Sequence, residues 1–184
     1  MKRKFLVTMT LLALAIGSAV AGMKNPMVGG QEMYPSKNII QNAVNSADHT
    51  TLVAAVKAAG LVETLEGAGP FTVFAPTNEA FGKLPAGTVD TLLKPENKAT
   101  LTKVLTYHVV AGRLSASELM KKIKAGKGMA ELTTVEGGKL WVSLHDGKHI
   151  MLKDEKGGTA LVTIGNVFQS NGVIHVIDSV LMPN

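Results

Sequence analysis

The chain of 184 residues contains no cysteine. It therefore has no disulfide framework, no thiol nucleophile and no cysteine that could carry a lipid. Aromatic residues make up only 4% of the sequence, so the composition does not indicate a pocket rich in stacking side chains. Without crosslinks the fold must depend on an ordinary hydrophobic core, which a chain of this length can bury.

Signatures of the common enzyme classes are missing as well. The sequence has no G-x-S-x-G elbow, no P-loop and no H-E-x-x-H motif. Two glycine pairs, at 67–69 and 126–128, lack the third glycine and the preceding strand that a dinucleotide site requires. Asp154 and Glu155 are adjacent carboxylates, but they lie in a glycine-rich turn. We therefore expect a protein that is not an enzyme and carries no cofactor.

The first 21 residues have the features of a secretory signal peptide. A basic start at 2–4 precedes an apolar stretch at 5–20, and small residues at 19–21 form a cleavage site. No later stretch approaches the roughly 18 apolar residues that a membrane span needs. The sequence thus predicts cleavage after Ala21, export to the periplasm or the extracellular space, and no membrane span.

Removal of the three basic residues of the signal lowers the net charge from +5 to +2. Such a small charge does not indicate binding to nucleic acid. One lysine cluster remains on a predicted helix and its exit, at positions 121, 122, 124 and 127. A solvated helix face is the simpler interpretation, and a patch for anionic glycans or lipid headgroups is the alternative.

Hydrophobic periodicity divides the exported chain into an arm and one domain. Residues 22–35 hold two prolines and two adjacent glycines without a sustained period, which indicates a flexible N-terminal arm. The domain spans residues 36–184. Helices are predicted from Ser36, at 50–60, 61–65, 88–93 and 96–106, and to about 124 from a cap at Ser115 or Ser117.

A strand at 71–75 interrupts the helical half, and the period becomes alternating from residue 130. Strands are predicted at 131–136, 139–144, 148–153, 159–168 and 173–182, separated by glycine-bearing turns. In the last of these strands, Val173, His175 and Ile177 should face one side of the sheet. Helices followed by a β-meander describe an α+β domain.

Three stretches carry a family resemblance: FTVFAPTNEAF at 71–81, TYHVV at 106–110 and NGVIHVIDSVLMP at 171–183. In this order and spacing they resemble a fasciclin-like domain. The resemblance covers about residues 36–183 and implies a β-wedge or sandwich of antiparallel strands with a helical layer from the N-terminal half. The resemblance also implies that the protein is a single-domain, secreted bacterial member of this family.

The resemblance further implies an interaction or cell-adhesion module. Its expected partner is a protein or polysaccharide of the cell envelope or the extracellular matrix. A carrier of a small apolar ligand such as a carotenoid is the alternative. Neither the oligomeric state nor the identity of the partner follows from the sequence.

The same segments supply the candidate interaction residues. Tyr107-His108 matches a Tyr-His motif that is implicated in integrin-dependent adhesion in some matrix members of the family. The alternative interpretation is that the pair packs in the core. Its internal hydrogen bonds would then go to a residue such as Asp178 or His175. The candidate set is Tyr107, His108, Thr77, Asn78, Asn171, Gly172, His175 and Asp178. An Asp-Ile pair of adhesive members corresponds here to Asn166-Val167. The missing carboxylate weakens an integrin interpretation.

The remaining histidines and methionines do not predict a metal site. His145, Asp146 and His149 span a turn, where side chains diverge, and no third distant ligand is evident. His49 is expected to be part of a helix cap, and His175 to face the core. Met23, Met27 and Met33 could bind a cuprous ion, although docking of the arm onto the domain is favoured.

Overall fold

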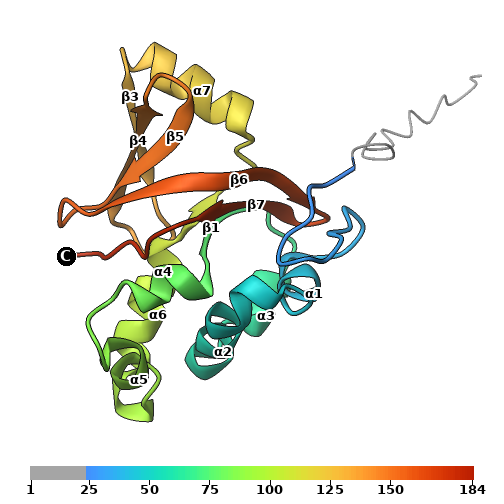
Figure 1. Ribbon diagram of the computed structural model, residues 1–184, viewed down its shortest axis with the longest axis vertical. Helices are drawn as coiled ribbons and strands as arrows, with labels where there is room; N and C mark the ends of the chain where they lie inside the picture. The colour runs from blue at the N-terminus through green and yellow to red at the C-terminus, as the bar shows by residue number, and fades with distance from the viewer. Residues whose placement is uncertain (1–23) are drawn as a thin grey trace, which may run out of the picture.

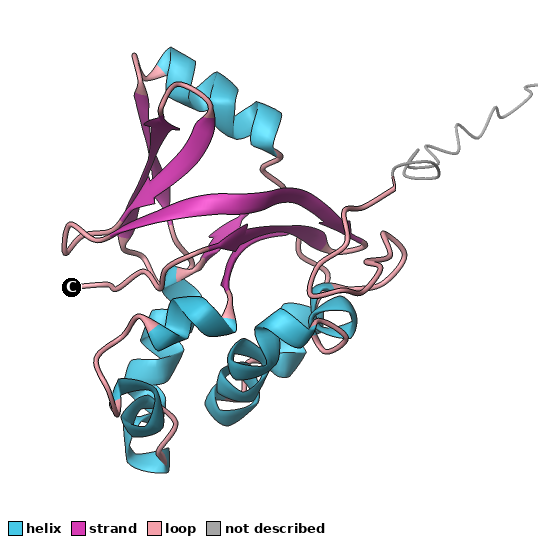
Figure 2. Ribbon diagram, viewed as in Figure 1, coloured by secondary structure: helices cyan, strands magenta, loops and turns pink. Residues whose placement is uncertain are grey.

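A computed structural model describes residues 24–184, so the predicted signal peptide lies outside the described residues (Figures 1 and 2). The helices of this part are α1 (Ile39–Ala43), η1 (Ala47–His49), α2 (Thr50–Ala59), α3 (Val62–Glu66), α4 (Asn78–Gly82), α5 (Thr88–Leu92), η2 (Pro95–Asn97), α6 (Lys98–Tyr107) and α7 (Ala116–Ala125). The strands are β1 (Phe71–Pro76), β2 (Val109–Ala111), β3 (Met129–Thr133), β4 (Lys139–His145), β5 (His149–Lys153), β6 (Thr159–Gln169) and β7 (Gly172–Ile177). This succession of elements confirms the predicted α+β class.

The strands form one sheet in the order β2-β1-β7-β6-β5-β4-β3. Neighbouring strands are antiparallel except β1 and β7, which run parallel from Phe71 opposite Gly172 to Pro76 opposite Ile177. The predicted wedge of antiparallel strands is therefore confirmed, with one parallel pair that was not predicted. A parallel pair needs a long crossover, and here residues 77–171 lie between the two strands.

Helices cover different parts of the sheet. Figures 1 and 2 show α1 to α6 on one side of the β1–β7 region, whereas α7 lies over the sheet formed by β3 to β5. The long strand β6 connects the two parts and shifts its register against β7 between Val162 and Val167. Asn166, within this irregular stretch, has a left-handed φ of 60°. The bulged strand bends the sheet into a wedge.

Two apolar cores result. The first lies between the sheet and the N-terminal helices and includes Val56, Leu105 and Ile174. The second lies under α7 and includes Leu119 and Ile177. Because neighbouring residues of a strand point to opposite faces, β7 contributes side chains to both cores and is buried along its whole length.

Side-chain caps set the starts of α1, α4 and α7. Thr77 caps α4 as predicted, since its hydroxyl accepts a hydrogen bond from the Ala80 amide at 3.2 Å. Of the two predicted serines, Ser115 caps α7, with Glu118 completing a capping box. The predicted start at Ser36 is wrong, because Asn38 caps α1 and Gln41 closes its capping box.

Residues 24–35 of the arm lie against the domain. The Asn25 side chain donates to the Phe168 carbonyl at 2.7 Å and accepts from the Phe168 amide at 2.8 Å. Val28 and Met33 are buried in the first core. The described part of the arm is therefore held against the domain by the two hydrogen bonds of Asn25 and by the buried side chains of Val28 and Met33.

Candidate functional site

Tyr107 ends α6 and is fully buried. Its hydroxyl donates to the Lys139 carbonyl at 2.5 Å and accepts from the Glu155 amide at 3.2 Å. Burial raises the pKa of Tyr107 to about 12, and the charge of Glu155 contributes to the rise. The phenol is therefore neutral and joins α6 to the turn that follows β5.

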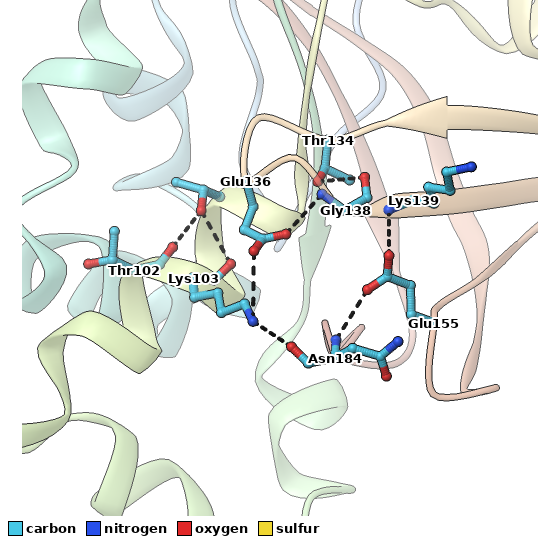
Figure 3. A network of polar contacts seen from close by, with 9 residues as sticks. Thr102, Lys103, Thr134, Glu136, Gly138, Lys139, Glu155 and Asn184 are labelled. Atoms are coloured by element: carbon cyan, nitrogen blue, oxygen red, sulfur yellow. Dashed lines mark hydrogen bonds and ion pairs between the residues drawn. The ribbon is translucent and has the colours of Figure 1, made fainter.

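A polar network lies around this turn (Figure 3). Glu155 accepts hydrogen bonds from the amides of Lys139, at 2.8 Å, and of Asn184, at 3.2 Å. The Lys103 ammonium contacts Glu136 at 3.8 Å and also binds the carbonyl of Asn184. Contacts between α6, the turns of the sheet and residue 184 thus surround the tyrosine on its polar side.

His108 follows Tyr107 as the C-cap of α6 and is buried. Nδ1 donates to the Val104 carbonyl at 2.8 Å, and Nε2 accepts from the Leu181 amide at 3.0 Å. The expected partners Asp178 and His175 are therefore not those found. Burial lowers the pKa of His108 to about 4, so the ring is neutral at pH 7.

His175 faces the second core, where its ring stacks on Phe74 with centroids 5.7 Å apart. Nε2 donates to the Leu114 carbonyl at 2.8 Å, and Nδ1 lies 3.4 Å from the Asn166 amide. Burial lowers the pKa of His175. Asp178, further along the chain, accepts from the Leu161 amide at 2.8 Å and lies 3.4 Å from the Lys83 ammonium.

Asn78 and Asn171 connect helices to other parts of the fold. Asn78 accepts from the Thr51 amide at 3.0 Å and donates to the Ala47 carbonyl at 2.9 Å. Asn171 donates to the Leu65 carbonyl at 2.7 Å and accepts from the Ile39 amide at 3.0 Å. Each amide therefore satisfies backbone groups at helix ends, which have no partners within the helix.

The close approach of two strands requires glycine at position 172. A Cβ atom at this position would lie 2.1 Å from the Phe71 carbonyl oxygen. Only glycine allows β7 to approach β1 at that point. The eight candidate residues thus lie at several separate places in the fold, and the structure brings none of His108, His175 and Asp178 into hydrogen-bond contact with one another.

The two alternative metal-binding readings receive little support. His149 contacts Asp146 at 2.9 Å in the exposed turn between β4 and β5. Between residues 24 and 184, no group of three or more His, Asp or Glu side chains is arranged to hold a metal ion. Met27 is exposed while Met33 is buried, and Met23 lies outside the described residues.

A cavity of about 70 Å³ lies within the first core, and its lining residues were not predicted from the sequence. We call it the His49 cavity. It is lined almost entirely by apolar side chains of α1, α2, α3, β1 and the end of α6, among them Ile40, Ala43, Val53, Val56, Leu65 and Leu105. Val135 and Lys57 also line it and are exposed, so they mark its mouth.

His49 is the distinctive polar residue of this lining. The ring is only 3% exposed, Nδ1 lies 2.8 Å from the Ser46 hydroxyl, and Nε2 has no hydrogen-bond partner among residues 24–184. His49 occupies the N-cap position of α2 as expected, but its side chain makes no capping hydrogen bond. Burial lowers the pKa of His49, and the nearby Ala75 backbone and Asp48 charge oppose this shift.

Comparison with known proteins places the chain in a family. Residues 47–183 match the Fasciclin domain. The chain is 45% identical over 160 residues to Protein sll1483 of Synechocystis, covering 87% of this chain and 81% of that protein. It is 35% identical over 173 residues to Cell surface glycolipoprotein MPB83 of Mycobacterium bovis, covering 91% of this chain and 70% of that protein.

A solved structure agrees with this match. The FAS1 domain pair from the insect cell adhesion molecule Fasciclin I superposes with a TM-score of 0.69 over 79% of this chain and 51% of that chain, at 18% identity. The protein belongs to the fasciclin family, and the wedge of seven strands with its helices is the FAS1 fold. Within the part of the chain described, no helix is both long and apolar enough to cross a membrane.

Proposed function

We propose that the protein is an exported, non-catalytic interaction module that binds a protein or polysaccharide of the cell envelope or extracellular matrix. Family membership supports this class of function, since the structural relative Fasciclin I is a cell adhesion molecule. The name of the relative MPB83 places that protein at the cell surface. The predicted signal peptide supports export of this chain.

The observation that carries the proposal is a group of exposed apolar side chains around α1. Met27 is 59% exposed, Tyr34 44% and Val44 49%. We call these three residues the arm surface. Contiguous apolar surface on a folded protein often marks an interaction site, and we propose that these three exposed side chains form such a surface. Tyrosine also suits an interface, because its ring is apolar and its hydroxyl can stay hydrated.

Contacts within the fold hold the arm surface in place. Tyr34 and Asn42 are joined by two hydrogen bonds of 3.0 and 2.8 Å between backbone and side chain. The arm runs beside α1 in Figure 1, and a Cβ on Gly29 would meet the Ser46 hydroxyl at 2.5 Å. The surface is therefore preorganised, which lowers the entropic cost of binding.

Affinity capture tests the proposal. The immobilised protein should retain a saturable partner from envelope extracts or envelope polysaccharides. A triple variant, Met27→Ser with Tyr34→Ser and Val44→Ser, should lose most of that binding and remain folded. Met129→Ser changes an exposed methionine beyond α7 and should bind as the wild type does. Absence of any saturable partner for the wild type would contradict the proposal.

The His49 cavity favours a second candidate function, carriage of a small apolar ligand. Incubation of the purified protein with a carotenoid tests the ligand that the resemblance implies: a visible absorption band that co-elutes with the protein would support it, and no band would remove it. Typical sites for drug-sized ligands enclose about 300–1,000 Å³. The cavity of about 70 Å³ supports a much smaller occupant.

A further inference from the structure

We propose that the His49 cavity binds a compact, neutral, apolar molecule that carries one hydroxyl group, and that this hydroxyl hydrogen-bonds Nε2 of His49. The inference is independent of the arm surface. It gives the second candidate function a narrower class of ligand. Its test uses soluble small molecules, so its failure would leave the capture experiment unaffected.

The lining determines the apolar character of the ligand. Side chains from α1, α2 and α3 face the sheet across the cavity, and almost all of the surface they present is apolar. A single water needs roughly 10–15 Å³ and two to four polar partners. The cavity exceeds that volume several-fold and offers few free polar groups. A small hydrocarbon body therefore fits this lining better than a cluster of water molecules.

His49 determines the polar group. A buried polar atom without a partner is unfavourable, and Nε2 is such an atom. The Ser46 hydroxyl can either donate to Nδ1 or accept from it, so Nε2 can be an acceptor or a donor. A ligand hydroxyl both donates and accepts and so satisfies either tautomer. A ligand carbonyl would satisfy only one of them.

Charge on the ligand is disfavoured. A buried carboxylate or ammonium would need a fully desolvated partner, and such burial is costly. Lys57, the charged residue of the lining, is exposed at the mouth of the cavity. The ring of His49 is kept neutral by burial, which lowers its pKa. Thus neither group offers a buried counter-charge.

Phenol, toluene and benzoate are matched probes for the test, because they share one ring and differ in the polar group. In NMR titrations of the protein, phenol and toluene should shift the signals of cavity residues such as Val53 and Leu105. Phenol should bind about fivefold more tightly than toluene, the ratio that one net hydrogen bond supplies. The ¹⁵N chemical shift of His49 Nε2 should change when phenol is added and remain constant when toluene is added.

Two variants separate the hydroxyl contact from the cavity itself. His49→Phe should lose the preference for phenol over toluene, whereas His145→Phe, in the exposed β4–β5 turn, should keep it. Ala43→Leu fills the cavity with His49 intact and should abolish binding of both ligands. The proposal is overturned if cavity signals do not respond to phenol, if benzoate binds more tightly than phenol, or if Ala43→Leu binds as the wild type does.

Discussion

At the scale of single residues, buried histidines stabilise the fold through their hydrogen bonds. His108 donates to the Val104 carbonyl at the end of its own helix α6 and accepts from the Leu181 amide, so the second bond joins the helix to the C-terminal segment. The Tyr-His pair that identifies the family in sequence is therefore buried and hydrogen-bonded. The same atoms could not also bind an external partner without opening the core.

Replacement of His108 should mainly affect stability. His108→Phe keeps a ring in the core but leaves the Leu181 amide and the Val104 carbonyl without partners. We expect a loss of about 2–4 kcal/mol in the free energy of unfolding, measured by urea denaturation. The exposed His149→Phe should change it by less than about 0.5 kcal/mol. A stable His108→Phe protein that no longer binds its partner would instead favour a direct role in binding.

The same histidine predicts how stability depends on pH. Its pKa is about 4 in the folded protein, below the ordinary value of 6.5. The unfolded chain therefore binds more protons between these values, and stability falls as the pH drops from about 6.5 to 4. The contribution of His108 is roughly 3 kcal/mol, and His175 acts in the same direction because its pKa is also lowered.

Urea titrations from pH 7.5 to 4 check this dependence. His108→Phe should show a clearly shallower decline than the wild type, since it lacks the group whose pKa is lowered to about 4 in the folded protein. His145→Phe should keep the wild-type slope. An equal slope for His108→Phe and the wild type would mean that other groups, such as the carboxylates, dominate.

The place of His49 in the cavity lining could not be predicted from its neighbours in the sequence. The local sequence Asp48-His49 before a helix is typical of a cap, and nothing nearby in sequence indicates a cavity. The lining comes from segments between Val28 and Ile174. An apolar space enclosed by such distant segments leaves no periodic signal in any one of them.

At the scale of elements, helix caps and turns are the features that the sequence predicts best. Thr77 and Ser115 were identified because a cap depends on residues within one helical turn. The start of α1 was misplaced by a few residues, since Ser36, Asn38 and their neighbours all resemble caps. The parallel partner of β1 could not be predicted, because that pairing joins residues about a hundred positions apart.

The Asn166 side chain links β6 to α7, and substitution of Asn166 tests how much this link stabilises the protein. Its side chain accepts from the Ala116 amide at 2.7 Å, at the first turn of α7, and its φ is 60°. Asn166→Ala should destabilise the protein by about 1–2 kcal/mol, because it loses this bond and suits positive φ poorly. Thermal or urea unfolding measures the change.

Two further substitutions separate the causes. Asn166→Gly relieves the strain at positive φ and should recover part of the loss. Asn166→Asp keeps an acceptor beside the helix start, where negative charge is favourable, and should lie within about 0.5 kcal/mol of the wild type. Equal losses for all three variants would show that the bond to Ala116 is not the reason. Asn166→Asp also restores the carboxylate of adhesive members of the family.

At the scale of the whole molecule, the central pairing of β1 with β7 connects both cores. A Cβ at Gly172 would come within 2.1 Å of the Phe71 carbonyl, and this neighbour is backbone that cannot move without separating the strands. Gly172→Ala should therefore cost more than about 3 kcal/mol or prevent folding. Circular dichroism during urea unfolding gives the measurement.

Gly82→Ala is the matched control for this prediction. Gly82 lies in α4, and its φ is not positive. A Cβ atom added at this position would have no other atom within 4 Å. Alanine favours a helix over glycine, so this variant should be as stable as the wild type or up to about 1 kcal/mol more stable. A wild-type stability for Gly172→Ala would show that β1 and β7 can separate slightly at no cost.

The position of β7 has a consequence for the order in which the molecule can form. This strand comes after every other strand in the chain, yet it lies between β1 and β6 in the sheet. Until residues 172–177 are available, β1 and β6 each have an edge without a partner, and the two groups of strands are joined only by the bridge between Val110 and Thr134 and the bond from the Val135 amide to the Val109 carbonyl. Final assembly of the sheet therefore waits for nearly the entire sequence.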